Sequence, residues 1–125
     1  MIESILTDQA PTPGGHYSQA VAWNGLVFVA GQLPIKPSGE KLTGAIEEQA
    51  HQVLQNLEHI LEAAGSGMDK VLKTTVYISD IELWRKVNDI YTTYFPTHKP
   101  ARAIVPVSTL HYGFLIELEA VAVIG

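Results

Sequence analysis

One apolar stripe on a predicted helix most constrains how this 125-residue chain can fold. Between residues 44 and 64 the apolar side chains recur with the 3.6-residue period of an α-helix. They are Ile46, Ala50, Val53, Leu54, Leu57, Ile60, Leu61 and Ala64. Thr43 or Gly44 can cap the start of this helix, and Gly65 can end it. A helix with a single apolar face must pack against another apolar surface.

Segments on both sides of this helix alternate with the two-residue period of strands. Asn24-Gly25 is a strong hairpin turn signal, and Ser79-Asp80-Ile81-Glu82 is a capping box that predicts a second helix ending at Pro96. Strands are expected at 17–23, 26–30, 70–78, 101–107 and 114–124. The order ββ-α-β-α-ββ predicts one α+β domain over residues 1–125, with two helices on one face of a mixed sheet of about six strands.

The second face of that sheet is also apolar, since residues 26–30 and 115–123 carry apolar side chains on both sides apart from Glu117 and Glu119. Two helices cover only one face, and large exposed apolar patches usually mark interfaces. We therefore expect a homo-oligomer that buries the second face.

Composition excludes several classes of function. The net charge of −5 disfavours nucleic-acid partners and anionic membrane surfaces, which bind basic proteins. No cysteine is present, which excludes disulfides and thiol chemistry. The N-terminal residues do not resemble a signal peptide, and no apolar run approaches the length of a membrane span. These features predict a cytoplasmic protein.

In the segment from Lys99 to Val107, one cation, Arg102, lies inside the otherwise apolar part that follows Lys99. Arginine is rarely buried without a partner, so Arg102 needs an anion, either Glu117 or a ligand. Spacing alone favours an interior ion pair between Arg102 and Glu117. Glu117 and Glu119 also share one strand face, about 7 Å apart. That pair could serve acid–base chemistry, although a solvated or interface-paired face is the commoner arrangement.

Other candidate residues lie in loops. Tyr17 follows Gly14-Gly15, and its phenol could donate to a ligand or simply form an amphipathic rim. None of the five histidines has metal-ligand spacing. His16 and His111 flank candidate site strands, so they either share a site or are ordinary surface residues.

Several segments together resemble the Rid (YjgF-like) family over nearly the whole chain. The matching segments are Tyr17-Ser18-Gln19-Ala20, Ala30-Gly31-Gln32-Leu33-Pro34, Glu48 to Gly65, Lys73-Thr74-Thr75-Val76, Val87-Asn88 with Tyr94-Phe95, Lys99-Pro100-Ala101-Arg102 and Ile116-Glu117-Leu118-Glu119-Ala120. The resemblance implies a chorismate-mutase-like fold and a homotrimer with ligand clefts between subunits. It also implies hydrolysis of reactive enamine or imine acids, such as 2-iminobutanoate and 2-iminopropanoate, to 2-oxo acids and ammonia, without a metal or organic cofactor.

The resemblance also assigns roles. Arg102 would hold the substrate carboxylate, and Glu117 would position or activate the attacking water. Tyr17 would close the cleft from a neighbouring subunit, and backbone groups near Gly31 and Ile104 would line it. An imine is already electrophilic, so positioning with modest acid–base help suffices for its hydrolysis.

The sequence departs from the usual family pattern around this predicted site. His16 replaces a common Pro, Ala30 a Ser, Ala103-Ile104 a Ser-Cys pair and His111-Tyr112 a Pro-Lys-like pair, and Pro106 stands where an acid is frequent. These changes leave the particular substrate open. They also leave open a non-enzymatic binder or sensor of small carboxylates on the same trimer. A ribonuclease or translation inhibitor, functions attached to parts of the family, is disfavoured by the −5 charge.

Overall fold

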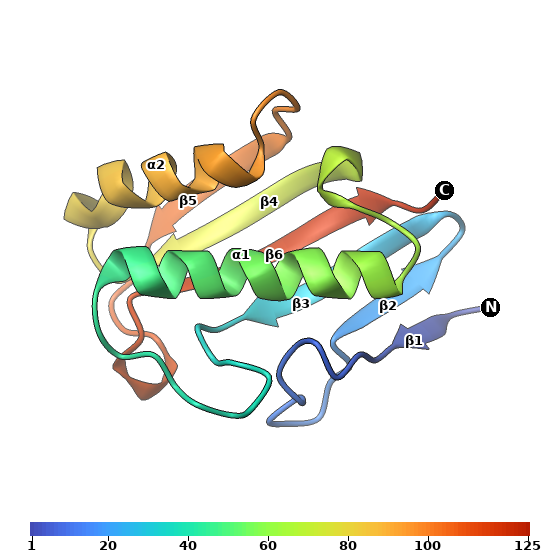
Figure 1. The fold of residues 1–125 in the computed structure, drawn as a ribbon, viewed down its shortest axis with the longest axis horizontal. Helices are drawn as coiled ribbons and strands as arrows, with labels where there is room; N and C mark the ends of the chain where they lie inside the picture. The colour runs from blue at the N-terminus through green and yellow to red at the C-terminus, as the bar shows by residue number, and fades with distance from the viewer.

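The computed structural model describes residues 1–125 and contains one six-stranded sheet with two helices on one face (Figure 1). The strands are β1 (Glu3–Ile5), β2 (Ala20–Trp23), β3 (Leu26–Gln32), β4 (Val71–Ile78), β5 (Ala101–Pro106) and β6 (Ile116–Val123), and the helices are α1 (Ile46–Ala63) and α2 (Trp84–Tyr94). The strand order is β1-β2-β3-β6-β4-β5, with β4 and β5 parallel and all other neighbours antiparallel. The predicted α+β mixed sheet is confirmed.

The N-terminal part of the chain differs from the prediction. Residues 3–5 form the extra edge strand β1, which pairs with β2 and lies where only loop was expected. Three residues are too short for a two-residue period to stand out from loop sequence. In addition, β2 begins at Ala20 rather than at Tyr17. The element order is therefore βββ-α-β-α-ββ.

The hairpin between β2 and β3 forms as its turn sequence predicts. Asn24 and Gly25 have φ values of 57° and 81°. Two consecutive residues in the left-handed region are typical of a type I′ turn, whose twist matches that of the two strands.

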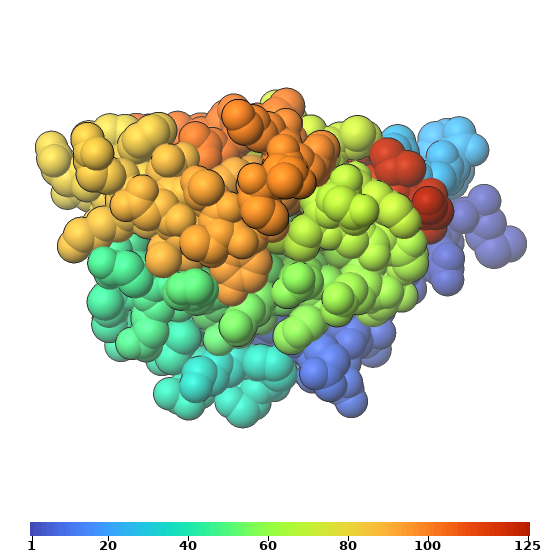
Figure 2. All heavy atoms as spheres, turned by 45° about the horizontal axis from the view of Figure 1, so that its top comes forward, coloured from blue at the N-terminus to red at the C-terminus, as the bar shows by residue number.

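The stripe on α1 packs on the inner face of the sheet and forms the core, as predicted. Its side chains from Ile46 to Leu61 are almost completely inaccessible, and they meet the inward residues of the central strands, such as Val27, Val76 and Leu118. Figure 2 shows α1 (green) and α2 (yellow to orange) side by side over this face. The stripe therefore determines which face of the sheet is covered.

The ends of the helices only partly follow the prediction. Gly65 ends α1 with φ of 81°, as expected. The residue before α1 is Ala45, and no side chain caps this end, so the predicted cap at Thr43 or Gly44 is wrong. Before α2, Asp80 rather than Ser79 accepts a hydrogen bond from the backbone N–H of Glu82 at 2.9 Å. That bond starts a single 3₁₀ turn, Ile81–Leu83, and α2 follows it.

Two irregularities in the sheet change which residues share a face. The β4–β6 register shifts between Val71 and Lys73, so Val71 and Thr74 are both buried while Leu72 is exposed. The two-residue period of the predicted strand 70–78 would place Leu72, Thr74, Val76 and Ile78 on one face, and this expectation is wrong for Leu72. The β3–β6 register shifts between Val29 and Gln32, where Ala30 and Gly31 lie in a bulge. A bulge redirects side chains locally, and this one lies at the candidate site.

The outer face of the sheet is covered by no element of the chain. Trp23 and Phe28 alternate with buried inward residues along β2 and β3, and they remain 52% and 43% exposed. Val123 on β6 and Val105 on β5 are also exposed. The predicted uncovered apolar face is therefore present in the single chain. Neither helix is long and apolar enough to cross a bilayer.

Candidate functional site

The carboxyl group of Glu117 lies directly over the backbone of Gly31. Glu117 projects from β6 on the outer face, opposite Tyr77 of β4, and it is half-buried. A Cβ atom placed on Gly31 would lie 3.1 Å from Cδ of Glu117 and still closer to a carboxylate oxygen. The bulge in β3 and the missing side chain of Gly31 together make room for the carboxyl group.

The surroundings of Glu117 favour its protonated form. Burial raises the pKa of this carboxyl above its ordinary value, and repulsion from Glu119 adds to the shift, while His111 partly opposes it. Glu119 is exposed and accepts a hydrogen bond from the Tyr77 hydroxyl at 3.0 Å. Glu117 and Glu119 therefore do share a face, and the half-buried Glu117, with its raised pKa, is a candidate for proton transfer.

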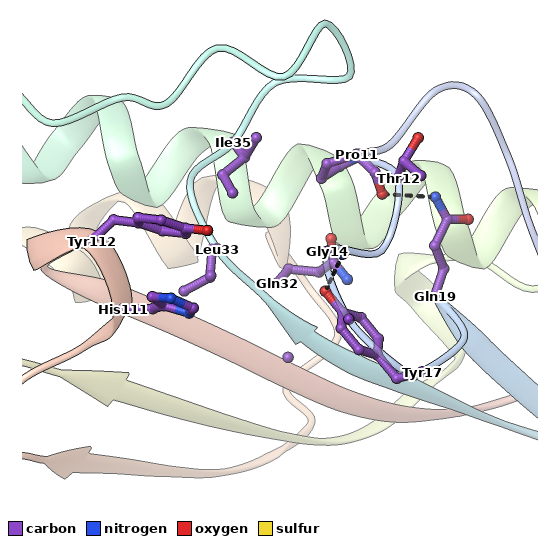
Figure 3. A pocket seen from close by; sticks show the side chains of 12 residues that line it. Pro11, Thr12, Gly14, Tyr17, Gln19, Gln32, Leu33, Ile35, His111 and Tyr112 are labelled. Carbon is purple, nitrogen blue, oxygen red and sulfur yellow. Dashed lines mark hydrogen bonds between the residues drawn. The ribbon is translucent and has the colours of Figure 1, made fainter.

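Beside Gly31 the surface opens into a cavity of about 220 Å³, which Figure 3 shows from close by. Tyr17 lies on one side of this cavity, and His111 and Tyr112 lie on the other. Leu33 and Ile35 add apolar surface between them. We call this space the Tyr17 cavity.

The loop that carries Tyr17 is held in place by a buried amide. Gln19 donates to the carbonyls of Thr7 and Pro11, both at 3.0 Å, and accepts from the Thr7 N–H at 2.7 Å. The Tyr17 hydroxyl accepts a hydrogen bond from the Gly14 N–H at 3.2 Å. Half of the tyrosine side chain remains exposed, which allows it to contact a ligand.

His111 and Tyr112 form a fixed pair in the turn before β6. Their rings stack with centroids 4.0 Å apart and planes 6° apart. Tyr112 has φ of 58°, a left-handed conformation that is unusual for a tyrosine, and Lys41 Nζ lies 4.8 Å from its ring centroid. The structure thus brings His111 to the cavity. His16 is exposed and does not line the cavity, although its two neighbours in sequence do.

Arg102 lies elsewhere, on the opposite side of the sheet. It pairs with Thr74 in the parallel β4–β5 ladder and, like Thr74, faces α2. Its Nη1 donates to Oδ1 of Asn88 at 2.9 Å, and its guanidinium lies 4.7 Å from the ring centroid of Tyr91. A second cavity of about 430 Å³ adjoins it.

Arg102 makes no ion pair within the chain, so the interior pair with Glu117 that spacing alone favours is wrong. The two ion pairs of the structure are Lys36–Glu40 and Lys86–Glu47, both on the surface. Asn88 accepts one of five guanidinium N–H donors, which leaves the others available to an anion. Arg102 is therefore held in place by neutral groups and still lacks a counter-ion.

The predicted site residues form two groups in a single chain. Tyr17 and Gly31 line the Tyr17 cavity, and Glu117 lies against Gly31, whereas Arg102 and Ile104 lie on β5, at one edge of the sheet. Ile104 pairs with Val76 and packs against the core. The chain by itself does not bring the two groups together.

Sequence reasoning missed three residues that hold these groups. Asn88 and Tyr91 position Arg102, and Gln19 holds the loop of Tyr17. Asn88 and Tyr91 are three apart on a predicted helix and so share a face, but the strand that this face meets depends on tertiary structure. A glutamine beside a tyrosine in a loop carries no recognisable signal.

The fold and site define a class of protein: an α+β sheet protein with a half-buried carboxyl group beside a cavity and, on the other side of the sheet, an arginine without a counter-ion. No three His, Asp or Glu side chains come together to hold a metal ion. A family model described as Endoribonuclease L-PSP matches residues 7–124. The chain therefore belongs to the Rid (YjgF-like) family.

Relatives and solved structures agree with this assignment. A RutC family protein of Pyrococcus horikoshii is 48% identical over 123 residues, which is 98% of each chain. A 2-iminobutanoate/2-iminopropanoate deaminase of Rattus norvegicus is 46% identical over 122 residues, covering 97% of this chain and 89% of the rat protein. The crystal structure of a Rid-family protein of Yersinia pestis superposes with a TM-score of 0.96 at 43% identity, covering 99% of this chain and 100% of that one.

Proposed function

We propose that this protein hydrolyses reactive imine and enamine acids of the 2-iminobutanoate and 2-iminopropanoate type to 2-oxo acids and ammonia. One observation carries the proposal. A carboxyl group with a raised pKa, Glu117, lies over Gly31 beside an open cavity. The rat deaminase, 46% identical over almost the whole chain, supports the choice of reaction.

The reaction moves both protons of one water to the imine nitrogen, and we assign Glu117 to relay them. Its carboxylate accepts the first proton as the water oxygen bonds to the imine carbon, and passes it to the nitrogen, which gives a carbinolamine. The carboxylate then takes the hydroxyl proton of the carbinolamine and gives it to the nitrogen as the C–N bond breaks, so the carbonyl forms and ammonia leaves. Overall, one imine and one water give one 2-oxo acid and one ammonia. A raised pKa suits a group that must both accept and donate a proton near neutral pH.

In this proposal the working site lies between two subunits of a homotrimer. Arg102 and Ile104 of one subunit face Tyr17, Gly31 and Glu117 of the next. Three features support this arrangement: the two groups are apart in one chain, Arg102 has no counter-ion, and the outer face of the sheet is apolar and uncovered. The substrate carboxylate would be the missing anion, because a guanidinium binds a carboxylate through paired hydrogen bonds.

The test measures 2-oxo acid formation from imines that an amino-acid oxidase generates in situ. We expect the wild type to accelerate release over buffer, and Arg102→Ala and Glu117→Gln each to lower kcat/KM by about 10²-fold or more. If the wild type does not exceed buffer, the proposed reaction is wrong. Lys86→Ala, which removes an exposed cation of α2 from a surface ion pair, is the matched control.

Mixing the two inactive variants tests the shared site. In a ring of subunits that exchange freely, a one-to-one mixture of Arg102→Ala and Glu117→Gln places both intact groups at about a quarter of the interfaces. We expect activity to recover to about that fraction. No recovery in mixtures shown by mass spectrometry to contain both variants would place the two groups in the same subunit.

A second candidate function, a non-enzymatic sensor of small carboxylates, uses the same residues. Arg102 contacts only uncharged side chains, so its charge is available to bind a carboxylate whether or not a water is activated nearby, and this favours the sensor. Stabilisation by 2-oxo acids in a thermal-shift assay, without any imine turnover, would select this function. The family model's name raises ribonuclease activity, but the charge of −5 opposes RNA binding.

A further inference from the structure

The Tyr17 cavity is larger than the small side chains of 2-iminobutanoate and 2-iminopropanoate require. Its volume is about 220 Å³. An apolar cavity of about 150 Å³ is known to accept benzene. In the single chain, the space beside Gly31 is therefore large enough for a phenyl-sized group.

We propose that the Tyr17 cavity holds the side chain of the imino acid, and that this protein prefers substrates with large apolar, phenyl-sized side chains. This inference rests on the proposed function and names the substrate class for the same site. The imine carbon is trigonal, so its carboxylate and its side chain point about 120° apart. In this arrangement the imine carbon lies at Glu117 and the carboxylate binds Arg102 of the next subunit, and the cavity beside Gly31 is the adjoining space that the side chain would occupy.

The walls of the cavity suit a flat apolar group. The ring of Tyr17 lies on one side and the stacked rings of His111 and Tyr112 on the other (Figure 3). Leu33 and Ile35 lie between them and supply aliphatic surface. Aromatic side chains attract one another in edge or offset geometry beyond the effect of buried area alone.

The walls are also held in place before any ligand binds. Gln19 holds the Tyr17 loop, and Lys41 lies against the ring of Tyr112. A preformed cavity spares the ligand the cost of ordering its binding site.

The experiment compares imines generated from L-alanine, L-leucine and L-phenylalanine, with the rate of imine loss measured against trapping by semicarbazide. We expect kcat/KM for the phenylalanine-derived imine to exceed that for the alanine-derived imine by roughly tenfold or more. Leu33→Trp and, independently, Ile35→Trp fill the cavity and should reduce this ratio to about one or below. Glu62→Trp, on the exposed surface of α1, should keep the wild-type ratio.

A binding measurement separates this inference from the proposed reaction. Phenylpyruvate should raise the melting temperature of the wild type more than pyruvate does, and both cavity-filling variants should lose the difference. If no imine is hydrolysed but this difference appears, the reaction is wrong and the side-chain site stands. The inference is overturned if imines are hydrolysed and kcat/KM for the alanine-derived imine equals or exceeds that for the phenylalanine-derived imine. It is also overturned if no imine is hydrolysed and phenylpyruvate raises the melting temperature no more than pyruvate does.

Discussion

At the scale of single residues, the closest fit in the molecule is that of Glu117 against Gly31. The missing side chain at residue 31 is filled by the carboxyl group of residue 117, so neither residue can be considered alone. The same burial that fixes the carboxyl raises its pKa. The position of the Glu117 carboxyl and its raised pKa therefore both result from its burial against Gly31.

Gly31→Ala should lower activity without unfolding the protein. The new Cβ would collide with the Glu117 carboxyl, which must then move away from its position over the backbone. Misplacing a catalytic group by about 1 Å can cost about 10²-fold in rate. Steady-state kinetics with circular dichroism checks this. Gly44→Ala, where an added Cβ meets only a Glu48 carboxylate oxygen at 3.8 Å, is the control. Full activity in Gly31→Ala would contradict the role of this contact.

Glu117→Gln should stabilise the protein relative to wild type as pH rises. A carboxyl whose native pKa is raised binds its proton more tightly when folded, so it adds stability below its ordinary value of 4.5 and loses that contribution as pH passes through the raised native pKa. Glutamine does not ionise and avoids this loss. The difference in melting temperature, variant minus wild type, should be larger near pH 7 than near pH 4. Glu62→Gln controls for the removal of one exposed charge, and an equal difference at both pH values would refute the prediction.

At the scale of elements, α2 and β5 together fix the position of Arg102: β5 carries it, and α2 contacts its guanidinium. The parallel β4–β5 pair places the guanidinium under α2, where Asn88 and Tyr91, one turn apart, contact it. Neither contact neutralises the charge. This arrangement keeps the arginine ready for a carboxylate.

Asn88→Asp should weaken substrate binding more than Asn88→Ala does. An aspartate would form an ion pair with Arg102 and compete with the substrate carboxylate, whereas alanine only removes one acceptor. We expect KM to rise by about tenfold in Asn88→Asp, with a smaller change in kcat, because the residue acts through Arg102. Asp89→Asn, on the exposed side of α2, is the control. A fall in kcat with KM unchanged would show that Asn88 does something other than position Arg102.

Helices and strands could be predicted where an apolar pattern repeats over many residues. Very short strands and local shifts of strand register could not. The eight-residue stripe of α1 identified the helix and its buried face, and Asn24-Gly25 identified its hairpin. The three-residue β1 and the register shifts at Val71 and Gly31 leave no periodic signal, since each depends on the partner strand. For the same reason the identities of Arg102 and Glu117 could be proposed from sequence, while their placement on opposite faces could not.

At the scale of the whole molecule, the outer face of the sheet remains uncovered in a single chain. Trp23, Phe28 and Val123 are exposed on it, although large apolar side chains normally avoid water. Burial of this face between subunits would also bring the two halves of the proposed site together. A substitution that prevents assembly of the subunits should therefore also abolish activity.

Phe28→Asp should break the assembly and abolish activity while the fold survives. Phe28 projects from β3 onto the outer face and takes no part in the inner core, so a charge there disturbs only the contact between subunits. Native mass spectrometry and sedimentation should show a shift from trimer toward monomer. Glu82→Lys, at an exposed position before α2, is the control for a charge change. A fully active monomer would contradict the shared site.

The position of β6 has a consequence for how the polypeptide is made. It follows every other strand in the sequence, yet it lies at the centre of the sheet, between β3 and β4 (Figure 1). While the ribosome is still adding its residues, β1-β2-β3 and β4-β5 can form only two separate ribbons, each with an open edge facing the other. Open edges invite pairing with other nascent chains, and joining distant segments is slow. The eight residues of β6 thus close the sheet and also carry Glu117, the acid–base group of the proposed reaction.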